Sequence, residues 1–293
     1  MIPLKDWQAA GSYFDYRGQR IFCNSAGNAE APVLLLVHGF PTACWDWEAL
    51  WQPLAQRFHL LTLDMIGFGL SAKPTDYHYS LMDQADLFEY FLRQRGVSDY
   101  HILTHDYGVS VGQELLARQG DAGERPRLHS ICFLNGGLIP ETHRPLLVQK
   151  LLLSPLGGLV ARLTSKARFT ASMRRVFSRP ASPDVLDAFW TLMTNNNGVA
   201  VMPKLIHYIT ERRVHRERWV DAIVLSKLPV KLINGAADPV SGAHMVARYR
   251  ELVLNPDVTL LEEIGHYPQV EAPDEVLAAF LAFHDTRLAA TNR

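Results

Sequence analysis

Short apolar runs that alternate with longer amphipathic stretches constrain the fold of this chain more than any other feature. The apolar runs, rich in Val, Ile and Leu, lie at Val33–Val37, His59–Asp64, Tyr100–Thr104, Leu128–Leu134, Val230–Asn234 and Val258–Glu262. Helical periodicity fits the ranges Leu81–Arg95, Val109–Arg118, Ala243–Leu252 and Glu275–His284. Continuous apolar strands separated by helices are typical of a parallel sheet covered on both faces. We therefore predict an α/β fold in which helices flank a mostly parallel sheet, with an antiparallel hairpin at Tyr13–Gly27 before it.

The alternation of strands and helices stops between about Gly136 and Lys227. This stretch has successive helical patterns and no convincing strand, and prolines interrupt it. An inserted helical cap over the carboxyl ends of the strands is the natural interpretation. A separate helical domain is the alternative, but the strand pattern resumes at Val230. We expect a core at residues 1–135, a helical cap at 136–227 and the rest of the core at 228–293.

Charge and cysteine content exclude several classes of function. The 293 residues include 29 Lys and Arg against 30 Asp and Glu, so no basic field favours nucleic acid as a partner. The three cysteines, Cys23, Cys44 and Cys132, lack the spacing of a metal site and indicate a reducing compartment. The first residues do not resemble a signal peptide, and no apolar run reaches the roughly 18–20 residues that span a bilayer. We expect a cytoplasmic protein without a transmembrane segment.

Two candidate nucleophiles lie within five residues of each other. Gly108-Val-Ser110-Val-Gly112 matches the G-x-S-x-G pattern of serine hydrolases. Thr104-His-Asp106-Tyr-Gly108 has the same shape with an aspartate at its centre and follows the predicted strand directly. A nucleophile elbow is a tight turn between a buried strand and a helix, and Asp106 stands at that turn. Ser110 lies a helical turn later, where a small residue packs a helix against a sheet. We favour Asp106, whose alternative role is a helix N-cap.

Six short motifs follow one another along the chain. They are His38-Gly-Phe-Pro41, Asp64-Met-Ile-Gly-Phe-Gly69, Thr104-His-Asp-Tyr-Gly108, Asn135–Leu147, Gly235-Ala-Ala-Asp238 and Gly265-His-Tyr-Pro-Gln269. Their order resembles the α/β-hydrolase fold, and the pattern is similar to its aspartate-nucleophile branch, the epoxide hydrolases and haloalkane dehalogenases. Through Thr104–Gly108, Asn135–Leu147 and Gly265–Gln269 the chain is more similar still to the family of the mesoderm-specific transcript protein, from about Val33 to Phe283.

Two further residues complete a predicted catalytic triad with Asp106. His266 follows the last predicted strand, and an imidazole there can reach the elbow and act as a general base. Asp238 follows the preceding strand and can hold the imidazole in the correct tautomer, although Asp-Pro is also a good turn former. The chain order of nucleophile, acid and histidine agrees with the α/β-hydrolase arrangement.

Backbone amides can supply the oxyanion hole of such a site. Gly39 lets the chain turn after the strand Val33–Val37, so that the Phe40 N–H faces the site. Together with the Tyr107 N–H it would stabilise a developing oxyanion.

The leaving group depends on side chains that the resemblance places in the cap. Epoxide hydrolases use two cap tyrosines to protonate the epoxide oxygen. Tyr208 is the candidate for the first, and the second position falls near Trp219, where no tyrosine is present. Haloalkane dehalogenases hold halide with a tryptophan after the nucleophile and a second donor, and Tyr107 and Phe40 stand at those positions. We assign Tyr208 and Trp219 to substrate binding and favour epoxides.

A basic run follows Tyr208 in the sequence. Arg212, Arg213, Arg216 and Arg218 are interleaved with glutamates, and we interpret them as a solvated helix face rather than an anion or membrane site. Leu146–Leu153 can shape an apolar substrate entrance or pack the cap.

The sequence thus predicts a hydrolase that forms an alkyl-aspartate ester with a small, hydrophobic substrate, without a metal or cofactor. The alternatives are a haloalkane dehalogenase, a serine esterase using Ser110, and a non-catalytic protein that binds a small ligand.

Overall fold

A single mixed sheet forms the centre of the computed structural model, which describes the backbone of residues 1–291 and the side chains of residues 1–286. The strand order is β1-β2-β4-β3-β5-β6-β7-β8. The pairs β1/β2 and β2/β4 are antiparallel, and every later pair is parallel. The strand bounds are β1 (Ser12–Tyr16), β2 (Gln19–Ala26), β3 (Val33–Val37), β4 (His59–Leu63), β5 (Asp99–Thr104), β6 (Arg127–Phe133), β7 (Val230–Gly235) and β8 (Asp257–Leu261).

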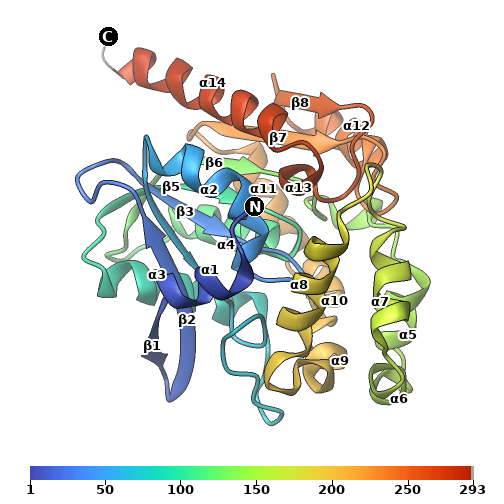
Figure 1. Ribbon diagram of the computed structural model, residues 1–293. Coiled ribbons are helices and arrows are strands. Elements are labelled where there is room, and N and C mark those ends of the chain that lie inside the picture. The colour runs from blue at the N-terminus through green and yellow to red at the C-terminus, as the bar shows by residue number, and fades with distance from the viewer. Residues whose placement is uncertain (292–293) are drawn as a thin grey trace.

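Helices cover both faces of this sheet (Figure 1). One face packs against α1, α2 and α14 through a core that includes Trp7, Trp51 and Phe280. The other face packs against α3, α4 and α12 through a core that includes Leu87 and Leu115. The core helices are α1 (Leu4–Ala10), η1 (Cys44–Trp47), α2 (Glu48–Ala55), α3 (Leu81–Gln94), α4 (Tyr107–Arg118), α12 (Ala243–Leu252), α13 (Pro268–Glu271) and α14 (Pro273–Thr291).

The described chain between β6 and β7 contains helices and loops and no strand, and we call residues 136–227 the cap segment. Most of its helices gather beside the sheet at the lower right of Figure 1. They are η2 (Pro140–Thr142), α5 (Leu147–Leu152), α6 (Gly157–Arg162), α7 (Lys166–Met173), α8 (Pro183–Thr194), η3 (Asn195–Val201), α9 (Met202–Leu205), α10 (Tyr208–Val214) and α11 (Arg216–Val224).

The predicted α/β architecture is confirmed. Every predicted strand lies within one residue of its observed bounds at each end, and the predicted hairpin corresponds to β1 and β2. The sequence did not predict α1 or α2, which are short helices without a long periodic stretch. No helix in the described part of the chain combines the length and apolarity needed to cross a membrane.

Candidate active site

Asp106 occupies a strained turn between β5 and α4. Its backbone lies at φ 46° and ψ −105°, a region that costs a non-glycine residue about 1–3 kcal/mol. The turn is also tightly packed. A Cβ atom on Gly108 would lie 2.6 Å from the carbonyl oxygens of Val37 and His38, and one on Gly39 would lie 2.7 Å from the Asp106 Cβ. Any larger residue at position 39 or 108 would therefore clash with its neighbours. The backbone at Asp106 has the form of a nucleophile elbow.

Asp106, His266 and Asp238 come together at the carboxyl ends of the strands. The Nδ1 of His266 lies 2.7 Å from Asp238 Oδ2, and its Nε2 lies 3.8 Å from Asp106 Oδ1. Asp238 also accepts hydrogen bonds from Asn135 Nδ2 at 3.0 Å and Ser241 Oγ at 2.7 Å. All three members of the predicted triad are buried. The imidazole thus lies between two carboxylates, and its hydrogen bond is with Asp238.

The charges at this site support a resting ion pair. Burial alone would lower the pKa of His266, but the charge and hydrogen bond of Asp238 and the charge of Asp106 outweigh it and raise the pKa to about 9. Burial likewise opposes the charge of Asp238, but His266, Asn135 and Ser241 hold the pKa of this carboxyl well below its usual range. At neutral pH His266 is therefore cationic in the resting protein.

The two predicted oxyanion donors flank the carboxylate. The Phe40 N–H donates to Asp106 Oδ2 at 3.0 Å. Tyr107 is the first residue of α4, so its N–H has no acceptor within the helix and is available to a group at the turn. Phe40 thus holds Oδ2, whereas Oδ1 lies 3.8 Å from His266 Nε2 and from Arg212 Nη2.

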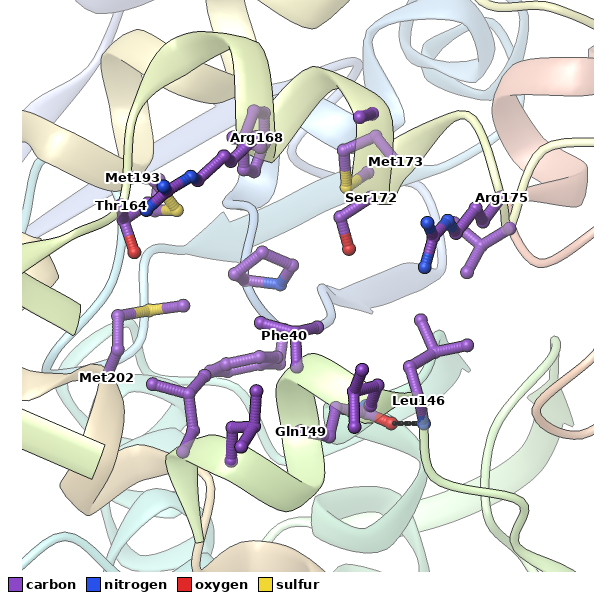
Figure 2. A pocket seen from close by; sticks show the side chains of 18 of the residues that line it. Phe40, Leu146, Gln149, Thr164, Arg168, Ser172, Met173, Arg175, Met193 and Met202 are labelled. Carbon is purple, nitrogen blue, oxygen red and sulfur yellow. Dashed lines mark hydrogen bonds between the residues drawn. The ribbon is translucent and has the colours of Figure 1, made fainter. Parts of the chain in front are cut away.

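An apolar cavity of about 500 Å³ opens onto Phe40, Asp106 and His266. Figure 2 shows Phe40 in the middle of the lining, between Met202 and Leu146, with Arg168 and Arg175 across from it. Most of the remaining wall comes from leucine, valine and methionine side chains of the cap segment. The reacting groups therefore face a mainly apolar space bounded by the cap.

Arg212 corrects the interpretation of the basic run as a solvated helix face. Its side chain is 1% exposed. Its Nη2 donates to the Asp106 carbonyl oxygen at 2.6 Å, and its Nε donates to Ser110 Oγ at 2.7 Å. The Nη2 also lies 3.8 Å from Asp106 Oδ1. A buried guanidinium thus binds the backbone of the elbow, a contact that the sequence did not predict.

One signal in the sequence could have identified Arg212. It lies four residues after Tyr208, so both share one face of α10, and its guanidinium lies 4.5 Å from the centre of the Tyr208 ring. Of the other members of the run, Arg213 is exposed, and two pair at or near the surface, Arg216 with Glu141 and Arg218 with Glu114 and Asp121.

Ser110 lies inside α4 and is fully buried. Its hydroxyl accepts the hydrogen bond from Arg212, and the residue does not belong to the described lining of the cavity. The serine of the G-x-S-x-G match therefore lacks both the strained backbone and the access to substrate space that Asp106 has.

The two residues assigned to substrate binding lie outside the described cavity lining. For Trp219 this is a correction. Its ring fills the contact between α11 and α4, where its Nε1 donates to Glu114 at 2.8 Å, so it is a core residue. Tyr208 is closer to the site, with its ring centre 5.7 Å from that of Phe40 and 5.1 Å from that of Tyr107. Its buried hydroxyl makes no hydrogen bond of ordinary geometry with the described residues.

Comparison with known proteins agrees with the fold. Residues 34–279 match the sequence model of the alpha/beta hydrolase family. The human mesoderm-specific transcript homolog protein is 40% identical over 294 residues, which cover 96% of this chain and 87% of that protein. The Mycobacterium tuberculosis protein LipZ is 36% identical over 281 residues, covering 95% of this chain and 97% of LipZ. A loop variant of haloalkane dehalogenase DbeA from Bradyrhizobium elkanii superposes with a TM-score of 0.79 at 19% identity, covering 97% and 99% of the two chains.

Proposed function

Since the chain belongs to the alpha/beta hydrolase family and is a hydrolase, we propose that it acts through a covalent ester on Asp106, with epoxides as the favoured substrates. The observation that carries this proposal is the backbone of Asp106, which is held at φ 46° and ψ −105° beside the His266–Asp238 pair. A helix N-cap needs no such strain. The strain is the expected cost of presenting a nucleophile at an elbow.

The first step forms the ester. Asp106 Oδ1 attacks a saturated carbon of the substrate, a new C–O bond forms, and the bond from that carbon to the leaving atom breaks with its electron pair. For an epoxide the leaving atom is the ring oxygen, which stays attached to the substrate and takes up a proton. His266 and Arg212, each 3.8 Å from Oδ1, place positive charge beside the attacking carboxylate.

The second step hydrolyses the ester. His266 takes a proton from water, the water oxygen attacks the Asp106 carbonyl carbon, and the oxyanion is stabilised by the Phe40 and Tyr107 amides. The bond between the Asp106 carbonyl carbon and Oδ1 then breaks, so Oδ1 takes up a proton and leaves with the substrate as an alcohol. The water oxygen stays behind in the Asp106 carboxyl group. Ester formation removes the charge of Asp106, one of the causes that raise the pKa of His266. The imidazole therefore becomes a base after the first step has occurred.

The choice of epoxides rests on Tyr208. Its buried hydroxyl makes no hydrogen bond of ordinary geometry with the described residues. Burial and the charge of Asp106 raise its pKa. A neutral hydroxyl suits proton donation to an epoxide oxygen. A halide needs two strong donors, and Tyr107 replaces the tryptophan that would supply one. The mainly apolar cavity favours a small hydrophobic substrate. A cytoplasmic location stays a prediction of the sequence.

Trapping the ester tests the proposal. His266→Gln should accumulate a covalent adduct when it is incubated separately with panels of epoxides, haloalkanes and carboxylic esters, because the base for the second step is missing. An epoxide adds its entire mass, whereas a haloalkane adds its mass without HX, so intact-protein mass spectrometry identifies the leaving group. Peptide mapping should place the adduct on Asp106. His78→Gln, which removes an exposed histidine, is the matched control and should accumulate nothing.

Single turnover in H₂¹⁸O separates the remaining alternatives. The wild-type enzyme, in excess over substrate, should place ¹⁸O in the Asp106 carboxyl group and leave the first product unlabelled. An acyl group on Ser110 would replace the proposal with a serine esterase. Absence of an adduct and of turnover with all three panels would favour a non-catalytic protein that binds a ligand.

A further inference from the structure

Exposed apolar side chains concentrate on two helices of the cap segment. We call Leu147, Val148, Leu151, Leu156, Leu159 and Leu163 the leucine patch. These six are the majority of the ten large hydrophobic residues that stand exposed in the described part of the chain. They lie on α5, on α6 and immediately beside α6, and these two helices lie side by side at the lower right of Figure 1. Apolar surface gathered in this way on a soluble domain marks an interaction site.

The leucine patch adjoins the cavity. Four of its members, Leu147, Val148, Leu151 and Leu163, are exposed and also line the cavity that contains Asp106. The patch is therefore continuous with the wall of the active site. An apolar molecule that leaves a surface pressed against the patch enters the cavity without crossing water.

The segment that carries the leucine patch is also basic. Residues 142–183 contain eight Lys and Arg and no Asp or Glu, although the whole chain has a net charge of −1. We call Lys150, Arg162, Arg168, Arg174 and Arg175 the basic collar. All five are exposed, and none forms an ion pair with another described residue. Arg168 and Arg175 lie at the cavity itself, as Figure 2 shows.

We propose that the leucine patch and the basic collar dock the protein on an anionic lipid bilayer, from which an apolar substrate passes directly into the cavity. Leucines beside basic residues, exposed on short surface helices, are the composition of a segment that lies in the membrane interface. The collar complements the negative surface of lipid headgroups. The choice of a lipid-dissolved substrate rests on the proposed function, whereas docking does not depend on it.

A second copy of the chain fits this surface less well. A twofold dimer places the same patch against itself, so the two basic collars would meet without acidic partners. No acidic residue in 142–183 is available to relieve that repulsion. An anionic bilayer can bury the leucine patch and neutralise the basic collar at the same time.

Vesicle binding tests the docking surface. The purified wild-type protein should float with vesicles of phosphatidylcholine and phosphatidylglycerol, bind vesicles of phosphatidylcholine alone at least about tenfold more weakly, and be released by salt. Leu156→Ser with Leu159→Ser should weaken binding at least about tenfold. Arg162→Gln with Arg174→Gln should weaken it about 25-fold, since each basic residue near an anionic surface contributes about fivefold. None of these four residues belongs to the cavity lining.

Matched double variants elsewhere on the surface complete the test. Leu225→Ser with Leu254→Ser removes two leucines that are 74% and 87% exposed, and Lys227→Gln with Arg250→Gln removes two exposed cations. Both should bind like the wild type. The proposal is overturned if the wild type ignores anionic vesicles, if the controls lose binding equally, or if the protein is a dimer that Leu156→Ser with Leu159→Ser converts to monomer. Because flotation measures no turnover, failure of docking leaves the Asp106 ester unaffected.

Discussion

Replacing the Asp106 carboxylate with the neutral amide of asparagine should release the proton that His266 holds in the resting protein. Asp106→Asn changes the charge of the side chain with little change in its size. An ester on Asp106 is also neutral, so the variant reproduces the electrostatic state of the proposed intermediate. The pKa of His266 in this variant therefore reports whether the imidazole can act as a base in the second step.

The size of the effect follows from the distance between the two groups. Nε2 of His266 lies 3.8 Å from Asp106 Oδ1. Unit charges at about this separation attract by about 4 kcal/mol at an effective dielectric constant of about 20, which corresponds to about 3 pH units. The hydrogen bond to Asp238 at 2.7 Å remains in the variant. We expect the pKa of His266 to fall from about 9 by roughly 2–3 pH units.

Histidine-selective NMR measures this shift directly. The protein is labelled with ¹⁵N-histidine, its ring nitrogens are followed through a pH titration, and the His266 signal is assigned by its loss in His266→Gln. Ser110→Ala is the matched control, because it alters the helix that follows the elbow without removing a charge. Its His266 should titrate near the wild-type value of about 9.

Two results would refute the reasoning. A pKa that stays near 9 in Asp106→Asn would mean that Asp238 alone holds the proton, and ester formation would then not produce a base. An equal fall in Ser110→Ala would mean that packing at the elbow, rather than the charge of Asp106, determines the pKa.

Three further predictions concern residues around the elbow. Arg212→Met should lower the free energy of unfolding in urea by about 3 kcal/mol or more, because two charge-assisted hydrogen bonds are lost; an effect under about 1 kcal/mol would show that Arg212 is dispensable. Tyr208→Phe should slow ester formation with epoxides about 100-fold in rapid-quench assays and leave haloalkanes unaffected; equal slowing of both would assign Tyr208 to packing. Burial and the nearby Arg212 lower the pKa of His143 to about 3, so the unfolded chain binds this proton more readily than the folded one. The free energy of unfolding should therefore fall below about pH 6.5 by about 1.4 kcal/mol per pH unit from this residue, and His143→Leu should remove that part of the slope.

The strands of the fold and the positions of the predicted triad residues could be predicted from the sequence, because both depend on short stretches of the chain. Buried parallel strands are continuous apolar runs, and Asp106, Asp238 and His266 each stand shortly after one. Since parallel strands end at one edge of the sheet, residues after their carboxyl ends meet there. The contacts that the cap segment makes with the core could not be predicted in the same way. Trp219 faces α4 because of how α11 packs, and the position of this residue in the chain gives no indication of that direction.

The hydrogen bond between Arg212 and Ser110 gives a structural reason for both buried residues. It also accounts for the serine motif beside Asp106. An arginine buried to 1% exposure needs acceptors, because a desolvated guanidinium is costly without them. Ser110 Oγ and the Asp106 carbonyl oxygen supply two, at 2.7 and 2.6 Å. The carbonyl belongs to the residue whose φ is positive, so the bond from Nη2 helps to hold the strained turn in place. Ser110, one helical turn after Asp106, thus anchors the buried Arg212 guanidinium beside the elbow. This contact gives the G-x-S-x-G match at Gly108–Gly112 a structural reason that does not require Ser110 to be a nucleophile.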